Sequence, residues 1–64
     1  MATLTKKERY IKDITSHLQQ ALAIVNDIDV NAMSLLELKA AAAQATQAGG
    51  MLHRLEGIVE SEQN

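Results

Sequence analysis

The sequence predicts an all-α protein: an antiparallel helical hairpin that dimerises into a four-helix bundle. The chain has no proline and is rich in alanine, leucine, glutamine, glutamate and lysine, which are strong helix formers. Apolar residues recur every three or four positions in two separate segments, as they do along one face of a helix. A chain of 64 residues buries a small core, and with no cysteine for a disulfide we expect association with another copy to stabilise it.

The first helix is predicted over about residues 6–28. Thr5 and Glu8 have the spacing of a capping box, in which each side chain accepts a hydrogen bond from the other residue's amide. Polar residues cluster over 26–31, which suits a helix end and a turn at 29–33. The apolar face between these limits consists of Ile11, Ile14, Leu18, Ala21, Val25 and Ile28.

The second helix is predicted over about residues 35–60. Ser34 and Glu37 form a second and clearer capping box, and Met33 and Leu38 have the spacing of a hydrophobic staple. The apolar face of this helix consists of Leu38, Ala41, Ala45, Ala48, Leu52, Leu55 and Val59.

Gly49 and Gly50 lie inside the second predicted helix, where each glycine costs about 0.8–1.0 kcal/mol relative to alanine. One interpretation is a break that creates a third helix from residue 51. The other is a continuous helix with glycine where a neighbour comes close. The apolar face crosses the pair without a change of phase, which favours the continuous helix.

The two apolar faces fit one antiparallel register, in which facing residues have numbers with a constant sum. At a sum of 66, six core positions of the first helix each meet a core position of the second. The predicted pairs are Ile28/Leu38, Val25/Ala41, Ala21/Ala45, Leu18/Ala48, Ile14/Leu52 and Ile11/Leu55. We therefore predict a single hairpin domain over residues 1–64 with heptad-type packing.

Further apolar or small residues flank this predicted seam on both sides. Two helices cannot cover both flanks, and an exposed apolar stripe is a liability unless it forms an interface. The candidate dimer or partner interface is Tyr10, His17, Leu22, Ile24, Leu35, Ala42, Gly49, Met51 and Ile58.

Basic residues concentrate at the N-terminus. Residues 1–12 hold four basic residues and one acidic residue, a net charge of +3, whereas residues 13–64 hold two basic and seven acidic residues, a net charge of −5. The cluster is Lys6, Lys7, Arg9 and Lys12. One interpretation is contact with nucleic-acid phosphates. The other is pairing with Glu56, Glu60 and Glu62, which an antiparallel hairpin brings alongside.

Catalytic and metal-binding chemistry is not predicted. His17 and His53 do not meet in the predicted register, and the chain has no phosphate loop, nucleophile motif or carboxylate pair. We expect no enzyme activity and no cofactor. No apolar run approaches the roughly 18 residues of a membrane span, and none follows the N-terminal lysines as in a signal peptide. We therefore expect a soluble, cytoplasmic protein.

The predicted architecture resembles the Rop family of small plasmid-encoded hairpins, which dimerise into four-helix bundles and bind paired RNA loops. The resemblance lies in helix number, helix length and core layering over most of the chain. It implies RNA binding along one outer bundle face, whereas the basic residues of this chain lie at one end. The leading hypothesis is a homodimeric adaptor, inhibitor or regulator of another protein, of the kind that phages and mobile elements encode. Nucleic-acid binding and a structural role in a larger complex are the alternatives.

Overall fold

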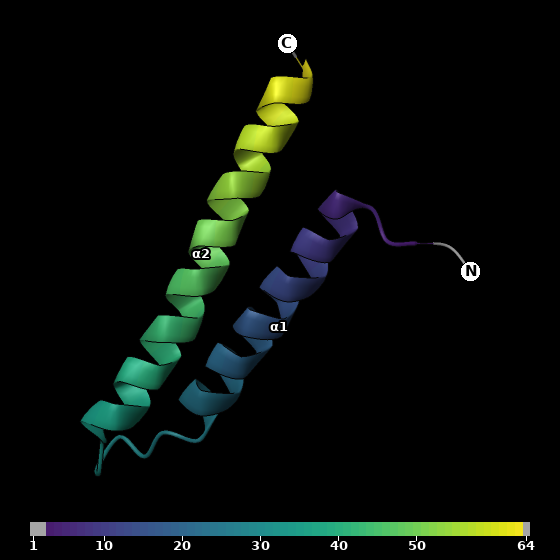
Figure 1. Ribbon diagram of the computed structural model, residues 1–64. Coiled ribbons are helices and arrows are strands. Elements are labelled where there is room, and N and C mark those ends of the chain that lie inside the picture. The colour runs from purple at the N-terminus through teal and green to yellow at the C-terminus, as the bar shows by residue number, and fades with distance from the viewer. Residues whose placement is uncertain (1–2, 64) are drawn as a thin grey trace.

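The protein is an all-helical hairpin in a computed structural model that describes residues 3–63 (Figure 1). Helix α1 spans Lys6–Asn26 and helix α2 spans Leu35–Gln63. Residues 27–34 connect them, and the two helices pack against each other. Both helices begin at the predicted residue, whereas α1 ends two residues earlier and α2 three residues later than predicted.

Helix α2 runs without interruption through Gly49 and Gly50, which confirms the continuous helix. Neither glycine has a positive φ, and a Cβ atom added at either would meet nothing within 4 Å. Within one hairpin, then, no neighbouring side chain requires a glycine at these two positions.

Side chains cap the start of both helices. Thr5 Oγ1 accepts from the Glu8 amide at 3.1 Å, and Glu8 Oε1 accepts from the Thr5 amide at 3.1 Å, so the first capping box is complete. The structure shows one half of the second box, a 3.4 Å hydrogen bond from the Glu37 amide to Ser34 Oγ. The box that looked clearer in the sequence is the less complete of the two.

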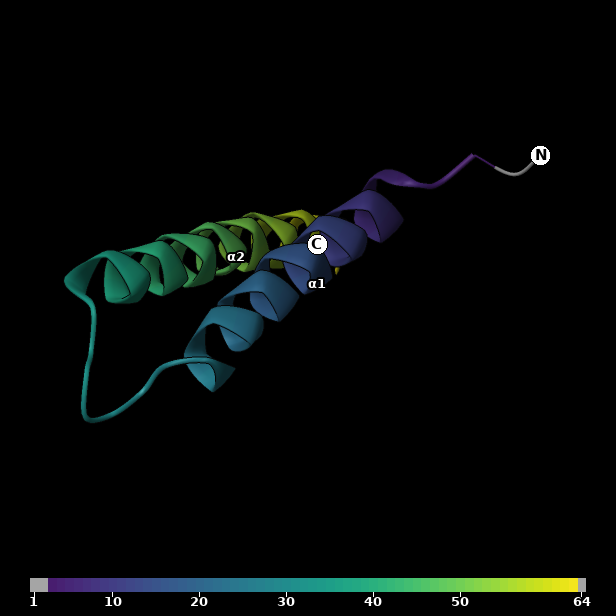
Figure 2. The ribbon, with the colours of Figure 1, turned by 90° about the horizontal axis from the view of Figure 1, so that it is seen from below.

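The molecule is one layer of helices. Its extents are 49 × 30 × 13 Å, and the shortest is close to the roughly 10–12 Å diameter of a single helix. Figures 1 and 2 show the helices side by side, with the C-terminal end of α2 reaching beyond the start of α1. In a single layer, no second layer of helices covers either face of the hairpin. Only Ile14, Ala41 and Ala48 are buried among the described residues, with exposed fractions of 4%, 8% and 0%.

The predicted seam is wrong in its rotation. Ile14, Ala41 and Ala48 lie at the helix contact as predicted, and Ala21, Ile28 and Leu55 are half-buried. The other seven predicted core residues are exposed: Ile11, Leu18, Val25, Leu38, Ala45, Leu52 and Val59. Half-buried positions outside the predicted seam are Tyr10, His17, Ile24, Gln44, Met51 and Ile58. Each helix is therefore turned about its axis relative to the prediction.

This error has a geometric cause. Residues seven positions apart form a row along a helix, and neighbouring rows lie about 50° apart at 3.6 residues per turn. Three neighbouring rows on each helix matter for the seam. The central row of α1 contains Ile14, Ala21 and Ile28, and that of α2 contains Ala41, Ala48 and Leu55. Either neighbouring row completes the three-and-four spacing with the central row. Periodicity alone therefore cannot tell which neighbouring row the hairpin covers and which it leaves exposed.

Candidate protein-interaction face

One face of the hairpin is covered with exposed apolar side chains. They form one row on each helix, each row with an exact spacing of seven residues. We call these two rows the apolar face: Leu4, Ile11, Leu18 and Val25 from the α1 side, and Leu38, Ala45, Leu52 and Val59 from α2. A seven-residue apolar repeat is the pattern by which helices pack on one another in bundles and coiled coils.

Helical geometry places both rows on the same side of the molecule. Each row lies about 50° from the central row of its helix, in the same rotational sense. Because the helices are antiparallel, equal rotations of the two turn both rows toward one face. The rows also match in height, because their helical residues pair at a sum of 63, close to the sum of 61 for the hydrogen-bonded residues His17 and Gln44. The resulting layers are Ile11/Leu52, Leu18/Ala45 and Val25/Leu38. Leu4 precedes α1 and lines a hollow together with Ile11.

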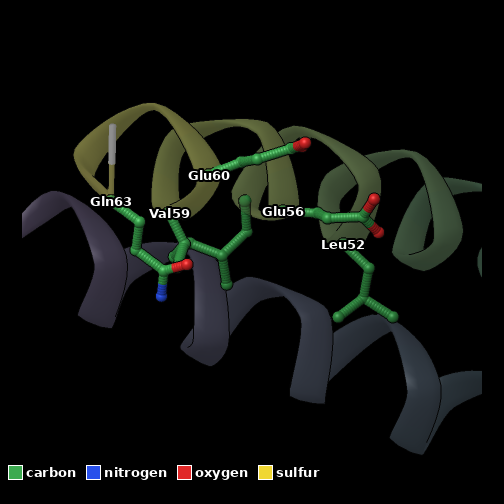
Figure 3. Close-up of a pocket in the computed structure, with 6 residues that line it drawn as sticks. Leu52, Glu56, Val59, Glu60 and Gln63 are labelled. Atoms are coloured by element: carbon green, nitrogen blue, oxygen red, sulfur yellow. The ribbon is translucent and has the colours of Figure 1, made fainter.

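Two shallow hollows lie at the open end of the hairpin, away from the turn. The α2 hollow is lined by Leu52, Leu55, Glu56, Val59, Glu60 and Gln63. Figure 3 shows Leu52 and Val59 extending from α2 toward α1, with the carboxylates of Glu56 and Glu60 beside them. The α1 hollow is lined by Leu4, Lys7, Glu8, Ile11 and Lys12. Each hollow thus combines residues of the apolar face with charged residues, which are acidic on α2 and mainly basic on α1.

The opposite, reverse face is more polar at its centre. His17 Nδ1 lies 2.6 Å from Gln44 Oε1, a hydrogen bond that joins α1 to α2. Tyr10 and Met51 line one hollow on this face, together with Lys6, Arg9, Asp13 and Arg54. The side chains next to the His17–Gln44 bond are half-buried, so the hairpin itself already covers much of this face.

The predicted interface residues are divided between the two faces. Half-buried residues beside the helix contact, on the reverse face, are Tyr10, His17, Ile24, Met51 and Ile58. Exposed residues at the edges of the apolar face are Leu22, Leu35, Ala42 and Gly49. The prediction missed the apolar face itself because it assigned those residues to the seam. The seven-residue spacing from Leu4 to Val25 and from Leu38 to Val59 could have identified it.

The basic cluster is distributed around α1. Lys7 forms an ion pair with Glu62, which confirms that the N-terminal turn lies beside the acidic end of α2. Lys12 lines the α1 hollow, whereas Lys6 and Arg9 line the reverse-face hollow together with Arg54. The four basic side chains therefore do not form one continuous patch.

Within the described part of the chain, no three His, Cys, Asp or Glu residues are grouped so that they could hold a metal ion. No helix over the same residues combines the length and apolar character needed to cross a membrane. Comparison with family models, curated proteins and solved structures finds no match to this chain.

Proposed function

We propose that this protein is a non-catalytic, homodimeric protein-interaction module. Two copies bury their apolar faces against each other and form a four-helix bundle. The outer surface of the bundle then binds another protein, which the module serves as an adaptor or regulator. The observation that supports this most directly is the apolar face, which forms three matched layers along the hairpin and is exposed in the single chain.

The exposed area supports the dimer. The hairpin has a solvent-accessible surface of 5173 Å2. Monomeric globular proteins of this mass expose roughly 4,000 Å2, so this chain exposes roughly 1,100 Å2 more than a compact monomer. A protein–protein interface of standard size buries about 800 Å2 on each partner. One interface over the apolar face therefore accounts for most of the excess.

Light scattering across a dilution series tests the dimer with a matched pair of variants. Leu18 is 46% exposed and lies in the middle of the apolar face, whereas Leu36 is 78% exposed and lies on the outer side of α2. We expect the wild type and Leu36→Glu to have the mass of a dimer and Leu18→Glu the mass of a monomer. A helical wild-type monomer at all concentrations would contradict the dimer.

The second part of the proposal, binding of another protein, is tested by affinity capture from the source cells. The bait is the wild-type protein, and Leu18→Glu is the control for partners that bind only the assembled bundle. We expect a stoichiometric partner with the wild-type bait. If neither bait retains a protein above background, the adaptor role is contradicted while the dimer still stands.

Nucleic-acid binding is the second candidate function, and the reverse-face hollow favours it. Lys6, Arg9 and Arg54 approach one another there beside Tyr10, and a dimer doubles this group. Binding of an RNA stem-loop should then weaken steeply with salt, and Lys6→Glu or Arg9→Glu should each weaken it several-fold. Lys39→Glu, near the turn, changes the net charge by the same amount as either variant and is the control. No binding at low salt would eliminate this function.

A further inference from the structure

We propose that the two copies associate with their turns at the same end of the bundle, so that α1 of each copy lies against α2 of its partner. This inference rests on the proposed dimer and adds its geometry. The two-fold axis then runs parallel to the helices, midway between the two hairpins. It passes between the apolar faces, and each apolar layer meets its own copy.

With the helix axes of the two copies aligned, only one other two-fold arrangement brings the apolar faces together. Its axis crosses the helices at right angles, the turns lie at opposite ends, and each helix packs against its own copy. Both arrangements bury the same two rows. They differ in which edge residues of the apolar face meet, and these are the residues about 90° from the hairpin contact on each helix.

The edge residues favour turns at the same end. On α1 the edge consists of Glu8, Thr15 and Leu22, and on α2 it consists of Leu35, Ala42, Gly49 and Glu56. With the turns together, Leu22 meets the partner's Ala42 and Thr15 meets the partner's Gly49, at the same heights as the apolar layers. A large side chain thus fits against a small one, and the glycine that nothing contacts within one hairpin gains a close neighbour.

The opposite arrangement mismatches the same residues. With the turns at opposite ends and the apolar layers aligned, Leu22 faces the partner's Glu8, and Ala42 faces the partner's Glu56. Leu22, one of the most exposed large apolar residues of α1, would then be buried against a carboxylate. Burying a charged group without a partner is costly, so this arrangement is disfavoured.

Charge at the open end points the same way. With the turns together, the α1 hollow of one copy lies over the α2 hollow of the other. In the same register Glu8 lies opposite the partner's Glu56, and Lys12 lies one helical turn from that carboxylate, above an apolar floor from both copies. Lys12 shares the hollow with Glu8, so its charge offsets the repulsion between the two carboxylates. In the opposite arrangement the α1 hollow lies over the partner's Val25 and Leu22. No acidic side chain of the partner then lies close enough to pair with Lys12.

Distances between spin labels distinguish the two arrangements, and the absence of native cysteine allows a single label per chain. Asn31→Cys places the label at the exposed turn, where the structure uses only the backbone amide of Asn31, bonded to Asp29 Oδ1. With the turns together, the two turns are about 10 Å apart, one helix spacing, so the labels lie within about 20 Å of each other. With the turns apart, the separation is about 45 Å, the length of a 29-residue helix at 1.5 Å per residue.

Gln47→Cys is the control, because it lies near mid-height on the outer side of α2, where both arrangements give similar distances. Light scattering on the same labelled samples separates the possible failures. A dimer with the short Asn31 distance supports the proposal. A dimer with the long distance overturns the arrangement and leaves the proposed function standing. A monomer overturns both.

Discussion

At the scale of single residues, the contact between the two helices depends on very small side chains. Ala48 has no exposed surface and Ala41 has little, so the helices approach closely where these two residues lie. A larger side chain at Ala48 has no free space and must push α2 away from α1. Overpacking of this kind costs about 1–3 kcal/mol.

We therefore expect Ala48→Leu to lower the free energy of unfolding by about 1–3 kcal/mol, measured by urea denaturation. Ala43→Leu is the matched control, because Ala43 is exposed on the same helix and both changes have the same effect on helix propensity. Equal stability of the two variants would show that Ala48 does not lie at a tight contact.

Gly49 and Gly50 form a second matched pair. Both lie in α2 with open space around the position of a Cβ, and Gly49 alone lies at the edge of the apolar face. Gly50→Leu should stabilise the helix by about 0.8 kcal/mol without affecting assembly. Gly49→Leu should gain the same propensity but raise the Kd of the dimer about tenfold or more, a cost of at least about 1.4 kcal/mol. The dimer Kd is measured by dilution in light scattering. A Kd that is unchanged in both variants would contradict a close partner at Gly49.

At the scale of helices, starts were more predictable than ends or rotation. The caps of α1 and α2 are local: Thr5 with Glu8, and Ser34 with Glu37, need only three residues of separation to form. The end of α1 at Asn26 depends on where the polar residues of the turn stop the helix, and the sequence pattern ran on to Ile28. The rotation of each helix about its axis depends on which row of side chains the other helix of the hairpin covers. That choice is set by contacts between α1 and α2, which are distant in the sequence.

The first capping box gives the prediction at this scale. Thr5→Ala removes the side-chain acceptor for the Glu8 amide and keeps the backbone amide that donates to Glu8 Oε1, so we expect a loss of about 1 kcal/mol in unfolding free energy. Thr3→Ala is the control, because Thr3 is exposed and precedes the helix. Thermal and urea unfolding followed by circular dichroism measure the difference. Equal stability of the two variants would mean that the cap contributes nothing.

At the scale of the whole molecule, the sequence predicted a hairpin with more apolar surface than two helices can bury. The structure identifies where that exposed surface lies. The candidate site was only partly predictable. Leu22, Leu35, Ala42 and Gly49 were expected at an interface and are exposed beside the apolar face. Leu18 and Leu52 were expected in the seam, because an apolar residue suits a hairpin seam and a bundle core equally well. Only the arrangement of helices in space distinguishes these two environments.

A charge exchange tests the arrangement of the two copies independently of labels. Lys12 and Glu56 lie at opposite edges of one hairpin, in separate hollows, and the one ion pair over residues 3–63 joins Lys7 to Glu62 instead. With the turns together, Lys12 of each copy lies within one helical turn of the partner's Glu56, and each dimer holds two such pairs. Lys12→Glu should therefore raise the dimer Kd about two- to thirtyfold at low salt, as for two exposed pairs of up to about 1 kcal/mol each. The double variant with Glu56→Lys should recover most of that loss, and high salt should reduce these differences because it screens exposed charges. Glu62→Lys is the control, since it disrupts the pair within one hairpin and should lower stability without a specific rescue by Lys12→Glu. If the double variant is no better than the product of the two single changes, Lys12 and Glu56 do not meet across the dimer, and the turns do not lie at the same end.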